Sequence, residues 1–429
     1  MSEEKFQVTA GLLALLLILS PAAGAADTNS DALMQLVNAR KFLELEQALQ
    51  KPDKLSITNQ DFFQGVLANR KNEIAASMRL LARVLDSKSP ELSAEQRRIG
   101  LLSLADDYAK SFQYGKAADT DALVLRELGA NLDEKTRTQI TADKRSYSLA
   151  RRFFVQTVKA DEPFTISTTH NAIGLTEVAV ETHGETKSWI LDTGAGLTTL
   201  STTYAKHLGL RLSEGTVPVS GASGAVSQGY LAVIPELRLG QAEFHNVVAL
   251  VIEDKNLYVP ELKLQLDAVL WSPVLTALGR LTFYADGRLE CGGGAASDSG
   301  AEMFMDDLPL VAIGTPAGIR LFVLDTGGNT TLLLSPYWEE NHVALGDPPL
   351  HPGTVAGIGG NSNIPAADLK NVPLFFGTVP MTMKEMAVFS QPRSAEGEYF
   401  YGYISQDLLR TLRSYTIDYR AMRFRIEAQ

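Results

Sequence analysis

Hydrophobic residues follow two different spacings along the chain, and the change falls near residue 160. From about Asp31 to Tyr147 they recur every three or four positions, as in DALMQLVNARKFLELEQALQ, which predicts packed α-helices. Pro52 and Pro90 fall between such segments, where helices should end. After Ala160, short runs with alternating apolar residues follow, such as TEVAVETHG and GYLAVIPELRLG, and these predict β-strands.

The helical residues, 27–155, contain a helix–turn–helix pattern. In LADDYAKSFQYGKAADTDALVLREL, small and aromatic residues stand where two antiparallel helices approach closely: Ala105, Tyr108 and Ala117. The segment resembles a degenerate tetratricopeptide repeat, with a poorer copy about 40 residues earlier. A peptide-binding repeat and a helical bundle that only packs are both consistent with this pattern.

The β-rich part of the chain repeats one order of features. In each half an apolar strand ends in Asp-Thr-Gly, at 192–194 and at 325–327. A glycine-rich hairpin follows, GASGAVSQG or AGIGGNSN, and each half closes with an apolar strand, a short helical run and a strand pair. The sequence therefore predicts two equivalent lobes, 161–292 and 303–429, joined by a flexible Gly/Ser-rich linker at 293–302.

With these paired motifs, the region from Asp161 to Glu427 resembles the aspartic proteases, the clan that includes pepsins and retroviral proteases. A glycine-rich hairpin in both halves resembles the paired flaps of retroviral enzymes in a single chain. The resemblance implies an α+β multidomain protein, with a helical, degenerate tetratricopeptide-like domain followed by a two-lobed all-β acid-protease fold. The implied activity is that of an aspartic-type endopeptidase, a peptide hydrolase.

The chemistry of such an enzyme explains why the motif occurs twice. Hydrolysis of a peptide without a metal requires one carboxylate that takes a proton from water and one carboxylic acid that protonates the carbonyl oxygen. Two carboxyl groups held about 3 Å apart share a proton and titrate as a pair, as is well known for aspartic proteases. The resemblance implies that Asp192 and Asp325 form this pair, one from each lobe.

The resemblance also gives roles to the neighbours of both aspartates. Thr193 and Thr326 are expected to donate hydrogen bonds to the opposite loop, and Gly194 and Gly327 to stand where a Cβ would obstruct the carboxylates. Substrate-binding residues are expected in the motif loops and flaps: Gly196, Gly221, Ala222, Ser223, Gly224, Asn329, Gly357, Ile358, Gly359 and Gly360. An ordinary β-hairpin turn describes the same flap residues.

Two positions depart from the pattern of the family. There, a strand with two apolar residues and a glycine packs beneath each catalytic loop, whereas this chain has Trp271 and Ser405 in place of the glycines. Because a tryptophan at such a site requires local rearrangement, the alternative is a non-catalytic peptide- or protein-binding module on a degenerate protease fold. A third alternative is that the helical region is an adaptor and the lobes are its scaffold.

Composition argues against several other classes of function. The chain carries 39 Lys and Arg residues against 50 Asp and Glu residues, a net charge of -11, and no basic stripe that would bind a nucleic acid. Its six histidines are scattered and lack the spacing of a zinc helix, so neither a metal nor a cofactor is predicted. The expected partner is a peptide or protein substrate, and a protein bound by the helical region is a further hypothesis.

The first residues resemble an export signal. MSEEKFQ is followed by the apolar run AGLLALLLIL and by the small residues of SPAAGAAD, so we expect a signal peptide at 1–26, cleaved after Ala25 or Ala26. The apolar run is shorter than the roughly 20 residues of a spanning helix, and membrane attachment is expected only if the segment stays uncleaved. Because Cys291 is the single cysteine, no disulfide can form within the chain. These features predict a periplasmic or secreted bacterial protein.

Overall fold

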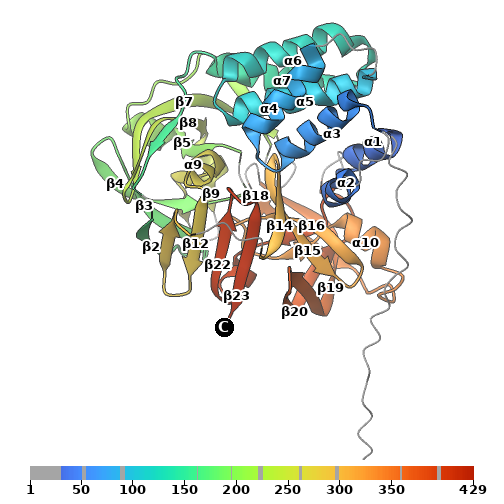
Figure 1. Cartoon of the computed structure of the whole chain (residues 1–429). Helices are drawn as coiled ribbons and strands as arrows, with labels where there is room; N and C mark the ends of the chain where they lie inside the picture. The colour runs from blue at the N-terminus through green and yellow to red at the C-terminus, as the bar shows by residue number, and fades with distance from the viewer. Residues whose placement is uncertain are drawn as a thin grey trace, which may run out of the picture.

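The chain folds into a helical region and a larger β-rich region that lies against it (Figure 1). The computed structural model describes residues 30–50, 55–86, 92–161, 163–194, 196–220, 226–259, 263–294, 299–357, 360–393 and 398–429. The predicted signal peptide, Pro52 and Pro90 lie outside these residues. Among the described helices, none has the length and apolar character needed to cross a membrane.

The helical region is built from neighbouring helices that pack in chain order. The described helices are α1 (Ser30–Asn38), α2 (Phe42–Leu49), α3 (Ile57–Arg70), α4 (Ile74–Asp86), α5 (Ala94–Lys110), α6 (Tyr114–Leu128), the 3-10 turn η1 (Gly129–Asn131) and α7 (Glu134–Ala150). The helical character predicted for this part of the sequence is confirmed. The resemblance to a tetratricopeptide repeat stays a prediction.

Helix ends and a separate core explain why this region folds as helices. At the start of α5, the Ser93 hydroxyl accepts from the Gln96 N–H at 3.1 Å, and the Ser93 N–H donates to the Gln96 side chain at 2.9 Å. Such a capping box satisfies backbone groups that the first helical turn leaves free. The apolar faces of the helices bury Leu45, Phe62 and Leu81 completely in a core of their own.

The first lobe is a set of short, mostly antiparallel strands. Its described elements are β1 (Thr157–Lys159), β2 (Phe164–His170), β3 (Thr176–Thr182), β4 (Glu185–Leu191), β5 (Thr198–Ser201), α8 (Thr202–His207), β6 (Thr216–Ser220), β7 (Val226–Leu239), β8 (Ala242–Ile252), η2 (Asp254–Leu257), β9 (Tyr258–Val259), β10 (Leu264–Gln265), β11 (Ala268–Leu270), α9 (Ser272–Ala277), β12 (Arg280–Tyr284) and β13 (Arg288–Cys291). The first strand, β1, pairs with β8 and so connects the chain leaving α7 to the sheet.

The second lobe contains a similar series of elements. They are β14 (Ala301–Asp306), β15 (Leu308–Thr315), β16 (Gly318–Leu324), β17 (Leu332–Leu333), α10 (Ser335–Asn341), β18 (His351–Gly357), β19 (Gly360–Phe376), β20 (Val379–Phe389), β21 (Gly402–Ile404), α11 (Gln406–Leu409), β22 (Leu412–Asp418) and β23 (Arg423–Ala428). The predicted linker 293–302 overlaps this lobe by two residues. Ala301 and Glu302 belong to strand β14, where they pair with β23.

Strand register makes the two lobes equivalent where the motifs lie. In the first lobe β4 runs parallel to β11, with Leu191 opposite Leu270. In the second lobe β16 runs parallel to β21, with Leu324 opposite Ile404. Each Asp-Thr-Gly segment therefore leaves the carboxyl end of a buried strand that is paired with the closing strand of its own lobe.

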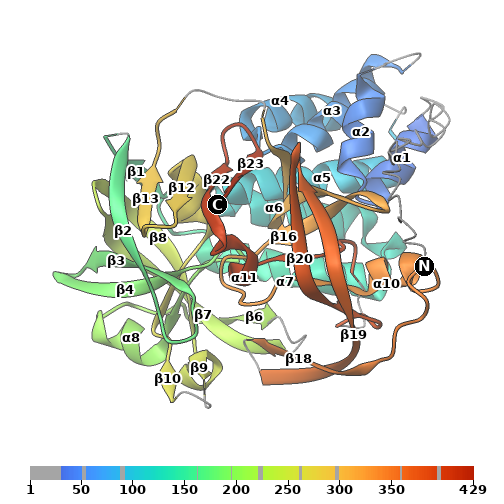
Figure 2. The same ribbon diagram turned by 90° about the horizontal axis from the view of Figure 1, so that it is seen from below.

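A shared sheet joins the lobes. Strands β12 and β22 pair antiparallel, with Phe283 opposite Tyr415, and the two rings stack with centroids 4.6 Å apart. Figure 2 shows β22 and β23 between the lobes. Apolar side chains from both lobes continue into one core around this sheet. The lobes are thus held together by backbone pairing and by a common core, which fixes how the motif loops face one another.

Candidate active site

Both motif aspartates are fixed at their backbone by the strand beneath them. The N–H of Asp192 donates to the Leu270 carbonyl at 3.1 Å, and the N–H of Asp325 donates to the Ile404 carbonyl at 2.9 Å. In each loop the glycine N–H then donates to the aspartate of its own motif, at 2.6 Å for Asp192 and at 3.0 Å for Asp325. The same local geometry therefore occurs twice.

The threonines of the two motifs exchange hydrogen bonds across the boundary between the lobes. The N–H of Thr193 donates to Oγ1 of Thr326, and the N–H of Thr326 donates to Oγ1 of Thr193, both at 3.0 Å. Each hydroxyl in turn donates to the opposite strand, Thr193 to the Leu324 carbonyl at 2.5 Å and Thr326 to the Leu191 carbonyl at 2.9 Å. Because both threonines are buried, these four bonds lock the loops together.

The glycines of the motifs lie against the aspartates of the opposite lobe. A methyl group on Gly194 would lie 2.6 Å from Oδ1 of Asp325, and one on Gly327 would lie 2.5 Å from Oδ2 of Asp192. The φ angles of both glycines lie outside the left-handed region, so the reason for glycine here is space and not backbone conformation. The structure thus brings Asp192 and Asp325 together, each packed on the motif of the other.

Burial and mutual repulsion act on both carboxyl groups. Burial, and then the negative charge of Asp325, raise the pKa of Asp192 well above the usual carboxyl range. Burial also raises the pKa of Asp325, but less, because the N–H groups of Gly327 and Gly328 and the charge of Arg393 favour its ionised form. The pair is therefore expected to retain one proton at pH values where an exposed aspartate has none.

Trp271 and Ser405 occupy the same place in the two lobes without distorting it. Trp271 has φ -129° and ψ -176°, and Ser405 has φ -132° and ψ -174°. The Trp271 ring lies 3.9 Å from the position of a Cβ on Gly196, an ordinary contact distance, so the indole packs against this loop without overlap. The strand pairing before both residues is also the same, so the backbone of the first lobe does not depart here from that of the second.

Two residues that the sequence did not single out hold the second motif loop. The Gln406 amide donates to the Thr326 carbonyl at 2.9 Å and to Oγ1 of Thr176, in the first lobe, at 3.2 Å. Asp407 accepts from the backbone N–H of Thr331 at 2.8 Å and from its hydroxyl at 2.6 Å. Both residues lie at the start of α11, just after β21, the strand that pairs with the strand of the second motif. This position was the signal in the sequence that could have pointed to them.

The predicted substrate-binding residues are only partly placed. Gly196 and Asn329 are exposed in the motif loops, near the aspartates in sequence. Gly357 and Gly360 are paired in the β18–β19 hairpin. The remaining flap residues lie outside the described part of the chain: Gly221, Ala222, Ser223, Gly224, Ile358 and Gly359.

Residues 178–269 match the family model of aspartyl proteases. The matched stretch begins in β3, ends in β11 and includes the first Asp-Thr-Gly motif. It supports an aspartyl protease relationship for the first lobe.

Among solved structures, the chain matches a retropepsin-like aspartic protease from Rickettsia conorii with 15% sequence identity and a TM-score of 0.22. The match covers 32% of this chain and 94% of that protein, and a TM-score this low carries no argument about the site. No curated protein matches the chain.

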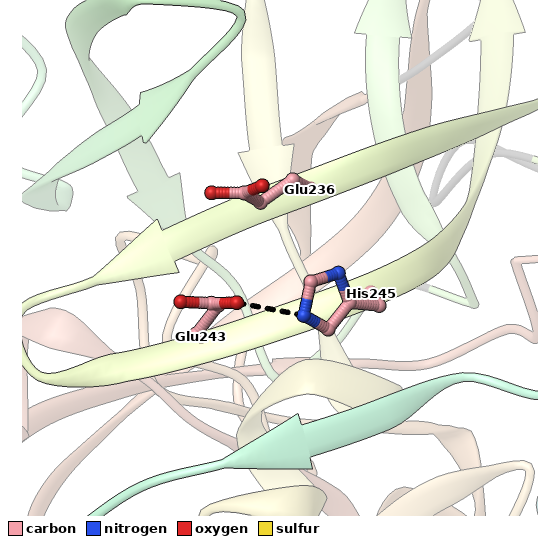
Figure 3. A group of neighbouring side chains, drawn as sticks. All are labelled: Glu236, Glu243 and His245. Atoms are coloured by element: carbon pink, nitrogen blue, oxygen red, sulfur yellow. Dashed lines mark ion pairs between the residues drawn. The ribbon is translucent and has the colours of Figure 1, made fainter.

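A separate group of charged side chains lies on the β7–β8 hairpin (Figure 3). Potential ligand atoms of Glu236, Glu243 and His245 lie within 4.8 Å of one another, and His245 Nε2 lies 2.7 Å from a Glu243 oxygen. The sequence does not reveal this group, because its members come from two strands. Arg238 lies 3.0 Å from Glu236 and 3.2 Å from Glu243, so both carboxylates already have a cationic partner. We assign the group to surface ion pairing.

Proposed function

We propose that this chain is an aspartic endopeptidase in which Asp192 and Asp325 together activate a water molecule. The observation that carries the proposal is the reciprocal packing of each aspartate on the glycine of the opposite motif, tied by the exchanged threonine hydrogen bonds. Further support comes from the family match of the first lobe. A structural role for the tripeptides alone would not require two half-buried carboxyl groups side by side, which is costly unless they share a proton.

The electrostatics of the pair suggest which carboxyl holds the proton. Asp325 receives the N–H groups of two glycines and the field of Arg393, and both favour its ionised form, whereas the charge of Asp325 disfavours ionisation of Asp192. Asp325 then accepts a proton from water as the oxygen attacks the carbonyl carbon, while Asp192 donates its proton to the carbonyl oxygen. Collapse of the resulting diol breaks the C–N bond. The amine leaves with the proton that Asp325 took up, and Asp192 takes back a proton from a diol hydroxyl as the carboxylic acid forms.

The substrate in this proposal is an extended peptide between the lobes. The β6–β7 and β18–β19 hairpins offer strands whose main-chain groups can pair with it. Gly196 and Asn329 lie in the motif loops, and the Asn329 amide can hydrogen-bond the peptide backbone whereas Gly196 has only its main chain. Water activation by the two carboxyl groups needs no cofactor.

The test is cleavage of a diverse peptide library by the protein from Asp27 to Gln429, over about pH 3 to 8. Defined cuts whose products carry new free termini support the proposal and report the side-chain preference. A folded protein that binds peptides but makes no cut would instead favour a binding module. The shared backbone geometry of Trp271 and Ser405 argues against that alternative.

We also propose that the protein is exported and that residues 1–26 are removed, on the basis of the apolar run and the small residues after it. N-terminal sequencing of the protein recovered from the periplasm tests this. A first residue at Ala26 or Asp27 is expected, and recovery of the intact N-terminus would contradict it.

A further inference from the structure

The helical region is anchored on the second lobe by charged and aromatic contacts. Asp306, at the end of β14, is 4% exposed and pairs with Arg40 and with Arg70, whose Nε lies 3.1 Å from its carboxylate. Phe42 of α2 lies against Phe304 with ring centroids 5.6 Å apart. These ion pairs fix the orientation of the helical region on the second lobe, because a buried carboxylate without a cationic partner would lower the free energy of unfolding.

The same helical region also packs on the first lobe, through a group of apolar residues that we term the bridging cluster. The cluster combines buried side chains from α6, α7, β6, β7, β8 and η2: Tyr114, Ala150, Val217, Val219, Leu231, Val248, Leu250, Ile252 and Leu257. Partly buried apolar residues pack against them: Phe112, Tyr147, Leu149, Phe153, Leu197 and Leu266. Figure 1 shows the helices across both lobes, in agreement with these contacts.

Strand β6 has fewer strand partners than β7 and β8, so the bridging cluster supplies a larger share of the contacts that hold it. Among the described strands it pairs with β7 and with no other, so it is an edge strand. Val217 and Val219 of β6 are 4% and 8% exposed, and the apolar surface that covers them includes Tyr147 and Leu149 of α7. The approach is close, since a methyl group on Gly215, just before β6, would lie 3.4 Å from Cδ2 of Leu149.

The bridging cluster continues into the loop of the first aspartate. Leu197, which belongs to it, lies five residues after Asp192 in the sequence. One continuous apolar contact therefore joins α7, the arms of the β6–β7 hairpin and the first motif loop. An edge strand without an apolar cover would be free to move away from its sheet, because few other contacts hold it.

We infer that the helical region is a positioning element of the cleft, in which Leu149 and Tyr147 hold the β6–β7 hairpin where the peptide backbone pairs with it. The inference rests on the proposed function for the identity of the substrate. It assigns the helical region a role in substrate affinity within this chain, distinct from recruitment of another protein. Neither side chain is placed in contact with substrate, so the effect acts through the hairpin.

The experiment compares Leu149→Asp with Ser148→Asp in the mature chain. Both place the same charge on the same turn of α7, but Ser148 is exposed and outside the bridging cluster. Hydrogen exchange of the β6 and β7 amides is measured first, with β22 and β23 as an internal reference. Leu149→Asp is expected to speed exchange in β6 and β7 by about tenfold, and to raise KM by a similar factor with kcat within about twofold, while Ser148→Asp changes neither.

A milder Leu149→Ala protein covers the case in which Leu149→Asp does not fold, and it should show a smaller change in the same direction. Equal exchange in β6 and β7 for parent and Leu149→Ala would overturn the inference, as would faster exchange with an unchanged KM. If the parent cleaves no peptide, the proposed function fails. Exchange confined to β6 and β7 would then still support the contact, because that readout does not require activity.

Discussion

Gly327→Ala tests the close approach of the two motif loops. The added methyl group would lie 2.5 Å from Oδ2 of Asp192 and closer still to its other carboxyl atoms, whereas real Cβ atoms essentially never come nearer than 3.0 Å to another heavy atom. The carboxyl group must therefore move by more than the difference of about 0.5 Å, or the loops must separate. Neither neighbour can yield easily, since the threonine hydrogen bonds hold both loops.

Two consequences follow from this overlap. Misplacement of a reacting group by up to about 1 Å costs roughly 100-fold in rate, so we expect kcat/KM to fall by about that factor. Overpacking of a buried site costs typically 1–3 kcal/mol, so the free energy of unfolding should fall by about 1–3 kcal/mol. Gly194→Ala should have a smaller effect of the same kind, because its methyl group would lie 2.6 Å from the nearest Asp325 atom.

The assays are peptide cleavage and urea unfolding, and Gly129→Ala is the matched control. Gly129 has φ -55° and ψ -31°, and a methyl group there would meet no atom within 4 Å. Its replacement should leave cleavage unchanged and stabilise the chain by roughly 0.4–1 kcal/mol. If Gly327→Ala cleaved within about twofold of the parent, the argument from close approach would be refuted.

Three further predictions concern the motif loops and the ion pair of Arg70 with Asp306. Thr193→Ala should lower the free energy of unfolding by about 2–4 kcal/mol in urea titrations, because it leaves a buried N–H and a buried carbonyl unpaired, and Thr193→Ser should restore most of the loss. Asp192→Asn should raise the melting temperature at about pH 8 but not at about pH 4. Because the folded state raises the pKa of Asp192, the protonated group contributes stability at low pH, and this contribution is lost as the pH rises through the raised pKa. The amide of asparagine does not titrate and so loses no stability over this range. Arg70→Ala should lower the free energy of unfolding in urea by about 1–3 kcal/mol, since it removes one guanidinium partner of buried Asp306 while Arg40 still pairs with it, and Arg70→Lys should recover part of the loss. No measurable loss would show that the Arg70–Asp306 pair does not anchor the helical region.

Local sequence patterns were sufficient for the elements and for the motif loops. An apolar strand followed by Asp-Thr-Gly defines both the strand and its end. Its repetition in two halves carried the resemblance that implied the pairing of Asp192 with Asp325, and in the structure each of these residues lies against the glycine of the opposite motif. The switch from helical to strand spacing near residue 160 marked the boundary between the two regions in the same way.

Contacts between residues far apart in the sequence could not be predicted from such local patterns. Gln406 reaches Thr176 in the other lobe, and α7 covers β6, through tertiary packing that no local period encodes. Trp271 looked disruptive in the sequence, but its indole packs near Gly196 of the first motif loop, a residue far away in the sequence, at ordinary contact distance. Space at such a site depends on which backbone segments meet there, and a single sequence does not state this.

The central claim is that one carboxyl group from each lobe acts in a single catalytic unit, and the kinetics of three variants test it most directly. Asp192→Asn, Asp325→Asn and the double variant are compared with the parent on one cleaved peptide. Groups that act as a unit are strongly non-additive, so each single variant should lose about as much kcat/KM as the double variant, by at least roughly 1,000-fold. If one single variant kept most of the activity, or if the two losses multiplied in the double variant, the shared dyad would be contradicted.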